Sequence, residues 1–168
     1  KLNRPEKRNA LDPETVLLFN DYSEKAKDKK YKSVVITGNG GAFCAGADLS
    51  ERKASWKGSK DALIRGYKPF FENIVKMPKP VIGSISGPAA GIGAAIAMSC
   101  DLRIMSEDSY IWSVFSNIAL VPDGGLSWYL PKYMGYSKAY EYAIEAKKIT
   151  AEECLKYGIA NKVVSSDK

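Results

Sequence analysis

Two glycine-rich segments are the first candidates for chemistry in this sequence. The first turn covers residues 38–48, and the second turn covers residues 87–93. Each stands where a β-branched run gives way to residues suited to a helix. Glycine lets the backbone approach a ligand closely, and the first amides of a helix have no intrahelical acceptor. Such turns can bind a phosphate or the developing oxyanion of a carbonyl group, or they can be tight turns with no ligand.

The nucleotide-binding motifs that use such turns are absent. The sequence contains no GxxxxGK[ST], and in the second turn Gly91 and Gly93 are followed by Ile96 where GxGxxG would need its third glycine. No acidic partner for a ribose stands out either. A nucleotide site is therefore not expected, which leaves the oxyanion and the tight turn as the open alternatives.

Acid and base chemistry must come from few residue types, because the sequence has no histidine. Ser-His and Cys-His nucleophiles are excluded, and proton transfer falls to Asp, Glu, Lys, Tyr or Cys. Asp123 is the strongest candidate. It follows the apolar residues Phe115, Leu120 and Val121, and apolar surroundings favour the protonated form that a general acid needs. It also lies in a Pro-Asp-Gly turn signal, so a purely structural role stays open.

The cysteines do not indicate a metal site. Cys44, Cys100 and Cys154 are an odd number at scattered spacings, without a CxxC pair or a histidine. They are typical of buried, reduced thiols in a cytoplasmic protein, and we expect no metal.

Length and composition predict one soluble domain over residues 1–168. The chain is 45% hydrophobic and 26% charged, with no run long enough for a membrane span and no signal peptide. Its net charge of +6 suits an anionic partner. The lysine-rich run at 25–32 is typical of a solvated helix end. The sequence has no nucleic-acid-binding motif beside it. The chain begins without methionine, so we expect its true beginning to be missing.

Alternating strands and helices must position these candidates, which predicts an α/β fold with a largely parallel sheet. Asp12 and Pro13 are typical of a helix start, with Val16, Leu17, Phe19 and Tyr22 facing the core. Residues 150–153 resemble a capping box that opens a helix ending at Gly158. The other predicted elements are strands at 33–37, 81–85, 101–105, 110–114 and 159–164, and helices at 62–76 and 94–99.

Five segments together carry a resemblance to a known family. They are LNRPEKRNAL at 2–11, GAFCAGADL at 41–49, KPVI at 79–82 with the second turn and CD at 100–101, VPDGG at 121–125, and ITAEE at 149–153. In this order they resemble the crotonase superfamily of enoyl-CoA hydratases and isomerases, and the isomerase-like members most. The resemblance implies a crotonase-like (ββα)n spiral core, a C-terminal helical region that is missing or shortened, and a homotrimer or hexamer.

The resemblance also implies roles for particular residues. The backbone amides of Ala45 and Ile92 match the oxyanion donors, and Lys7 and Arg8 match basic residues near the phosphates of coenzyme A. Coenzyme A is part of an acyl-CoA substrate, with no permanently bound cofactor and no nucleic-acid or membrane partner. Asp48 has a second interpretation as a helix cap. The coenzyme A site is further expected to include Ala45, Gly46, Ala47, Asp48 and Leu49.

The expected reaction depends on which carboxylates are present. The hydratases of the family carry two glutamates, and the matching positions here hold Ala95 and Phe115. Asp123 matches a place where isomerases carry an acidic residue. We therefore expect the conversion of a 3-enoyl-CoA to a 2-enoyl-CoA, with Asp123 as base and then acid. The alternatives are a hydratase with atypical acid and base groups, or a non-catalytic acyl-CoA-binding homologue.

Overall fold

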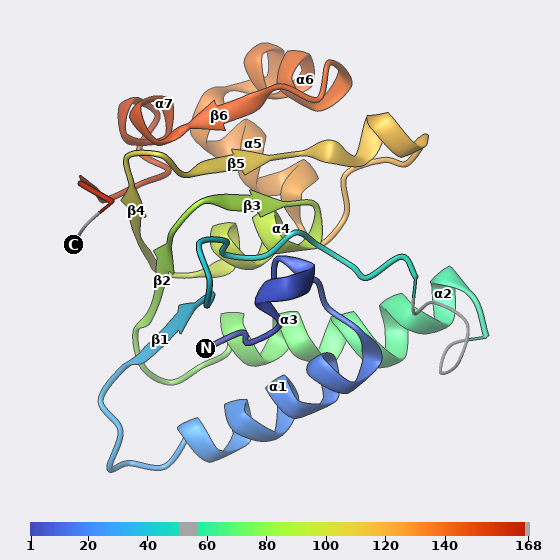
Figure 1. Ribbon diagram of the computed structural model, residues 1–168, viewed down its shortest axis with the longest axis vertical. Helices are drawn as coiled ribbons and strands as arrows, with labels where there is room; N and C mark the ends of the chain where they lie inside the picture. The colour runs from blue at the N-terminus through green and yellow to red at the C-terminus, as the bar shows by residue number, and fades with distance from the viewer. Residues whose placement is uncertain (51–56, 167–168) are drawn as a thin grey trace.

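A four-stranded parallel sheet forms one side of the molecule (Figure 1). The computed structural model describes residues 1–50 and 57–166. Hydrophobic, β-branched runs form the central strands, as the sequence predicts. The strand order is β1 (Val34–Thr37), β2 (Val81–Ile85), β4 (Leu102–Ser106) and β7 (Lys162–Val164). The predicted α/β class with a parallel sheet is confirmed.

A second sheet of three short strands lies beside the first. Strand β3 (Pro88–Ala90) pairs in parallel with β5 (Tyr110–Trp112), which pairs antiparallel with β6 (Lys148–Thr150). Strand β3 lies within the second turn, so this segment is partly a strand and not only a loop. Strand β5 ends two residues before the predicted boundary, because the chain then winds into the 3-10 helix η3 (Val114–Ile118).

The helices begin where the capping signals predict. Asp12 accepts a hydrogen bond from the Thr15 amide at 2.8 Å, and Thr150 and Glu153 form the predicted capping box. The predicted helix at 62–76 begins three residues earlier and contains a π-helical stretch. The helical elements besides η3 are η1 (Pro5–Lys7), α1 (Pro13–Ala26), α2 (Ser59–Asp61), η2 (Ala62–Tyr67), α3 (Lys68–Val75), α4 (Ile92–Ser99), α5 (Leu126–Met134), α6 (Tyr136–Ile144) and α7 (Ala151–Lys156).

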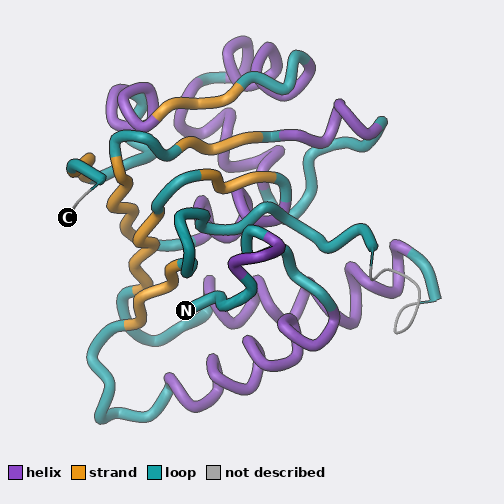
Figure 2. Tube along the Cα trace, viewed as in Figure 1, coloured by secondary structure: helices purple, strands orange, loops and turns teal. Residues whose placement is uncertain are grey.

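Helix α1 lies along the outside of α3, so only a narrow stripe of it is buried (Figure 2). Val16 is buried, and the ring of Phe19 stacks on Phe70 with centroids 3.8 Å apart. Leu17 and Tyr22 are 57% and 65% exposed, so the prediction that they face the core is wrong. A helix that packs on one neighbour buries only the residues on that side.

Helix α4 is at the centre of the hydrophobic core. All of its residues are buried, and they are small or aliphatic. The buried Arg103 donates hydrogen bonds to the carbonyl groups of Met98 and Cys100 at its C-terminal end. The same side chain donates to the Ile159 carbonyl oxygen. Arg103 therefore connects α4 to the segment that leads into β7.

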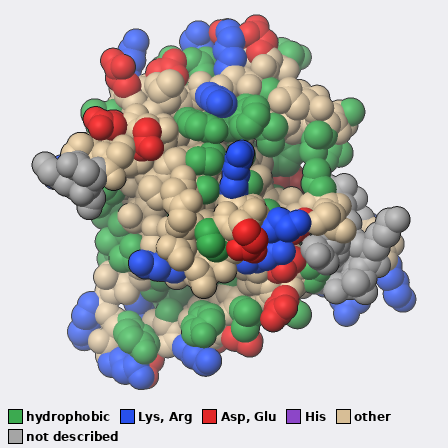
Figure 3. All heavy atoms as spheres, viewed as in Figure 1, with side chains coloured by type: hydrophobic (Ala, Val, Ile, Leu, Met, Phe, Trp, Pro, Cys, Tyr) green, Lys and Arg blue, Asp and Glu red, His purple; other side chains and the backbone are tan. Residues whose placement is uncertain are grey.

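The described residues were compared with the features of membrane spans, metal sites and reactive thiols. None of their helices is long and apolar enough to cross a bilayer, and they contain no group of three metal-ligating side chains. The three cysteines are free and buried, and burial raises the pKa of each thiol to about 12. On the face in Figure 3, basic side chains are spread over several places and do not form one patch.

Candidate active site

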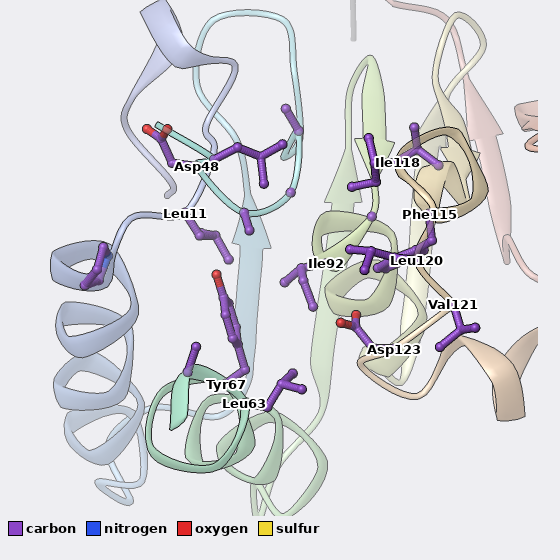
Figure 4. Close-up of a pocket in the computed structure, with 18 of the residues that line it drawn as sticks. Leu11, Asp48, Leu63, Tyr67, Ile92, Phe115, Ile118, Leu120, Val121 and Asp123 are labelled. Carbon is purple, nitrogen blue, oxygen red and sulfur yellow. The ribbon is translucent and has the colours of Figure 1, made fainter. Parts of the chain in front are cut away.

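A cavity of about 440 Å³ opens between the two glycine-rich turns (Figure 4). Its walls come from the end of the first turn, from η2, from the start of α4, and from η3 with the loop that follows it. The structure brings most of the predicted site residues to this cavity. Those that line it are Ala45, Gly46, Ala47, Asp48, Leu49, Ile92 and Asp123.

Lys7 and Arg8 do not line the cavity. Both are exposed, at the end of η1, and they belong to the N-terminal segment, residues 4–12, that runs beside the first turn. The Arg8 carbonyl oxygen accepts a hydrogen bond from the Ala45 amide at 2.9 Å. The two basic residues therefore flank the first turn from outside the cavity.

The two turns are joined by backbone hydrogen bonds. The Ala90 amide donates to the Cys44 carbonyl oxygen at 2.9 Å, and the amides of Phe43 and Cys44 both donate to the Pro88 carbonyl oxygen at 3.1 Å. A parallel bridge between Cys44 and Ala89 continues this pairing. The relative position of the turns is thus set by the main chain.

Two glycines permit this close approach. A Cβ atom added to Gly93 would lie 2.2 Å from the Cys44 carbonyl oxygen, which is far too close. Gly46 has a φ of +106°, and a Cβ there would lie 3.0 Å from the Ala90 carbonyl oxygen and 3.7 Å from the Ile92 nitrogen. We predicted that these glycines let the backbone approach a ligand closely. Here they let the backbones of the two turns approach each other.

The amide assignments at the cavity differ in part from the sequence prediction. The Ala45 amide is committed to the Arg8 carbonyl oxygen, which contradicts its predicted role as an oxyanion donor. Within residues 1–50 and 57–166, the amides of Ala47 and Ile92 donate to no protein acceptor. Ile92 is the first residue of α4, where an amide has no intrahelical acceptor. At least one amide from each turn therefore has no protein acceptor among the described residues.

Arg4 joins the first turn to the start of α1. Its guanidinium donates to the Asp48 carboxylate at 3.0 Å and to the Ala10 carbonyl oxygen at 2.7 Å, and it lies 3.3 Å from the Asp12 carboxylate. Asp48 also accepts from the Ser50 amide at 3.0 Å and the Ser50 hydroxyl at 2.6 Å. Hydrogen bonds from Ser50, and then from Arg4, hold the pKa of Asp48 below its usual value.

Asp48 therefore has a structural role at the edge of the cavity. Its carboxylate points away from the cavity in Figure 4, toward the groups that bind it. Whether it caps a helix, as one interpretation of the sequence has it, concerns residues 51–56, which lie outside the described residues. What the structure establishes is that Asp48 closes a turn with Ser50.

Asn9 is a second residue that binds the first turn, although the sequence motifs did not single it out. Its side chain donates to the carbonyl oxygens of Asn39 and Ala42 at 2.9 and 2.7 Å, and its own oxygen accepts from the Arg4 amide at 2.9 Å. The Leu11 amide donates to the Gly46 carbonyl oxygen at 2.8 Å. The motif at 2–11 carried this signal, since its polar residues are the ones that bind the first turn.

Asp123 is partly buried and directs its carboxylate into the cavity beside Ile92 (Figure 4). Its carbonyl oxygen also accepts from the Leu126 amide at 3.0 Å, which closes the turn before α5. The turn role and the place in the cavity therefore coexist. The hydrophobic side chains of Phe115 and Leu120 line the same wall.

The hydratases of the resembling family are expected to carry glutamates at two positions that hold Ala95 and Phe115 here. Both of these residues are packed against their neighbours. Ala95 is fully buried and does not line the cavity. A Cβ added to Gly124 would lie 2.6 Å from the Ala95 Cβ and 3.0 Å from the ring of Phe71, so the Gly124 backbone covers Ala95. Phe115 is 5% exposed and forms part of the cavity wall.

Comparison with known proteins places the chain in a family. Residues 1–168 match the enoyl-CoA hydratase/isomerase family model. The chain belongs to this family, which confirms the predicted resemblance and fold class.

Two curated relatives and two solved structures illustrate the relationship. The chain is 38% identical to "Probable enoyl-CoA hydratase echA6" of Mycobacterium tuberculosis over 97% of its length, and 33% identical to 1,2-epoxyphenylacetyl-CoA isomerase of Escherichia coli over 99%. It spans 65% of the length of each. An enoyl-CoA hydratase structure from Polaromonas has a TM-score of 0.89 at 32% identity, and one from Bacillus anthracis has 0.91 at 28%. The chain is covered at 98% and 99%, and those chains at 66% and 65%.

Proposed function

We propose that the cavity binds an acyl-CoA thioester and moves its double bond from the 3-position to the 2-position. The observation that carries this proposal is the Asp123 carboxylate, directed into an apolar cavity beside the Ile92 amide. One carboxylate beside one enolate is sufficient for a proton shift, whereas hydration by the usual route needs two.

In this proposal the amides of Ala47 and Ile92 bind the thioester oxygen. Ala47 replaces Ala45 as the first donor, because the Ala45 amide is bonded to Arg8. Preorganised amides lower the free energy of the enolate as negative charge develops on its oxygen, and one such donor is worth roughly 10²- to 10³-fold in rate. The contact between the two turns holds this pair in place without rearrangement during the reaction.

Asp123 then transfers the proton. Its carboxylate removes a proton from C2 of a 3-enoyl thioester, and the electron pair forms the enolate. The double bond moves from C3–C4 to C2–C3 as the enolate collapses, and the protonated Asp123 delivers the proton to C4. The hydrophobic residues that line the cavity exclude water from the intermediate.

Coenzyme A enters this scheme as part of the substrate, with no other cofactor. Backbone from Ala45 to Leu49 is proposed to contact its adenine and pantetheine parts, and Lys7 and Arg8 its phosphates. The two basic side chains are exposed beside the first turn, which leaves them accessible to phosphate groups. A homotrimer or hexamer is part of the same proposal and is tested by light scattering.

Hydration is the second candidate, and the names of some relatives favour it. The protein of Mycobacterium tuberculosis, at 38% identity, carries a hydratase name. A hydratase here would have to use Asp123 with an atypical second group, since Ala95 and Phe115 bear no carboxylate. Water addition to crotonyl-CoA at a rate comparable to isomerisation would support this alternative.

The deciding experiment measures conjugated thioester absorbance with 3-hexenoyl-CoA. The parent protein should convert it, and Asp123→Asn should lower the rate by at least about 10²-fold, because the base is lost. Asp21→Asn changes an exposed aspartate on α1 and should have no effect. Hexanoyl-CoA binding, measured by calorimetry, should be retained in both variants. A parent that forms no conjugated product, or an Asp123→Asn variant with full activity, would refute the proposal.

A further inference from the structure

The polar groups that face the cavity are few. Among the described residues that line it, only Asp48, Tyr67 and Asp123 have polar side chains. Asp48 is bound by Arg4 and Ser50 and points away from the cavity. Among the described residues, Tyr67 and Asp123 therefore supply the polar side chains that face an otherwise hydrophobic lining.

Tyr67 reaches the cavity because of an unusual helix. It is the last residue of η2, and the Lys68 amide donates to the Leu63 carbonyl oxygen five residues earlier. This π-type spacing brings residues five apart onto one side, so Ala62 and Tyr67 both line the cavity together with Leu63. Such segments are frequent at functional sites.

The Tyr67 hydroxyl points into the cavity from the wall opposite Asp123. Figure 4 shows its ring rising from η2 with the oxygen at the inner end, and the Asp123 carboxylate directed inward from the loop before α5. Ile92 lies between the two side chains in this view. An acyl group whose thioester oxygen is bound by the Ile92 amide would therefore pass between Tyr67 and Asp123.

We propose that Tyr67 is a specificity-determining residue, and that its hydroxyl donates a hydrogen bond to an oxygen atom on the acyl group. The preferred ligands would then be acyl-CoA thioesters with a hydroxyl or oxo group on the chain, beyond the thioester carbonyl. The inference rests on the proposed binding of an acyl-CoA but not on isomerisation.

The Tyr67 hydroxyl adds one directional hydrogen-bond donor to the hydrophobic residues described on this side of the cavity. A phenylalanine would supply the same ring for a hydrocarbon chain, and the neighbouring Leu63, Ile92 and Phe115 offer no donor from their side chains. Polar groups placed singly in an apolar cavity typically fix orientation and specificity. Asp123 is already assigned to proton transfer, so the recognition role falls to Tyr67.

Calorimetry with unreactive saturated ligands tests this inference. The ligands are hexanoyl-CoA and its 3-, 4-, 5- and 6-hydroxy derivatives, with product analysis by mass spectrometry to verify that they are unchanged. At least one hydroxy derivative should bind the parent protein about five- to tenfold more tightly than hexanoyl-CoA, as expected for one hydrogen bond. Tyr67→Phe should abolish this preference and leave hexanoyl-CoA binding within about twofold.

Tyr136→Phe is the matched control, because Tyr136 is 74% exposed and does not line the cavity. It should behave as the parent. Equal affinity of the parent for all five ligands would overturn the inference alone, as would a preference that survives in Tyr67→Phe. Absence of binding to every thioester would overturn both the inference and the proposed function. Binding with the expected preference but without isomerisation would support the inference and refute the proposed reaction.

Discussion

The two glycine-rich turns both line the cavity, but different interactions hold them. The first turn is held by polar side chains from the N-terminal segment, chiefly Arg4 and Asn9. The second turn pairs through its backbone with the first turn and with β5, and it continues into α4, which is buried along its whole length. The difference shows that two neighbouring walls of one cavity can depend on charged side chains in one place and on main-chain pairing and close packing in the other.

This difference has a consequence for sensitivity. Ion pairs and hydrogen bonds depend on the protonation of their members, so the first turn should respond to pH. Close packing depends on atomic volume and hardly on pH, so the second turn should respond to an added methyl group.

The largest effect should come from Gly93→Ala. The new Cβ would lie 2.2 Å from the Cys44 carbonyl oxygen, and backbone on both sides leaves little room to adjust. We expect a loss of at least about 3 kcal/mol in the free energy of unfolding, measured by urea denaturation. Gly83→Ala is the control: its Cβ would meet the Cys100 sulfur at 3.3 Å, and its effect should be much smaller. Equal stability of Gly93→Ala and the parent would contradict the packing account.

Arg4→Gln should have the next largest effect. It removes the charged partner of Asp48, whose side chain is 6% exposed, and we expect a loss of about 2 kcal/mol in the free energy of unfolding. The rate of turnover should fall as well, because the first turn carries the Ala47 amide. Lys30→Gln removes the exposed pair with Asp28 and should cost less than about 1 kcal/mol. Similar losses in the two variants would show that the Arg4 contacts contribute no more than a surface pair.

The pH dependence of the free energy of unfolding should distinguish a variant in the contacts of the first turn from one in the second turn. Because the pKa of Asp48 is lowered in the folded state, its contribution is complete above the ordinary aspartate pKa of about 3.9 and is lost as the pH falls through the lowered value. The stability difference between the parent and Arg4→Gln should therefore be constant from pH 7 to about 5 and shrink below about 4. The difference for Gly93→Ala should not change over this range. Parallel behaviour in urea titrations of both variants would count against the comparison.

The smallest effect is expected for Ser50→Ala. This variant removes the 2.6 Å hydrogen bond to Asp48 but leaves the Arg4 pair in place. We expect a loss of about 1 kcal/mol in the free energy of unfolding. A loss as large as that of Arg4→Gln would show that Ser50, and not Arg4, is the main partner of Asp48.

Much of the fold could be predicted from the sequence, because its signals are local. The helix start at Asp12, the capping box at Thr150 and the strand at Val81–Ile85 depend on neighbouring residues or on hydrophobic runs. Strands β3 and β6 were missed because each has three residues and is defined by distant partners.

The site could be predicted less completely. The motifs led to the two turns and to Asp123, which the structure brings to one cavity. They could not show that the Ala45 amide is used by Arg8, because this bond joins residues 37 positions apart through the folded chain. Tyr67 was missed because the direction of its side chain depends on the π-helical spacing of η2, and the residue composition does not predict this spacing.

The contact between Ala95 and Gly124 bears on how this cavity could acquire a different reaction. A Cβ added to Gly124 would lie 2.6 Å from the Ala95 Cβ, so the Gly124 backbone leaves little room for a longer side chain at position 95 on that side. Ala95→Glu alone would therefore disturb the loop that carries Asp123 before it could supply a second carboxylate. A route to two-carboxylate chemistry through position 95 would therefore have to alter this loop as well.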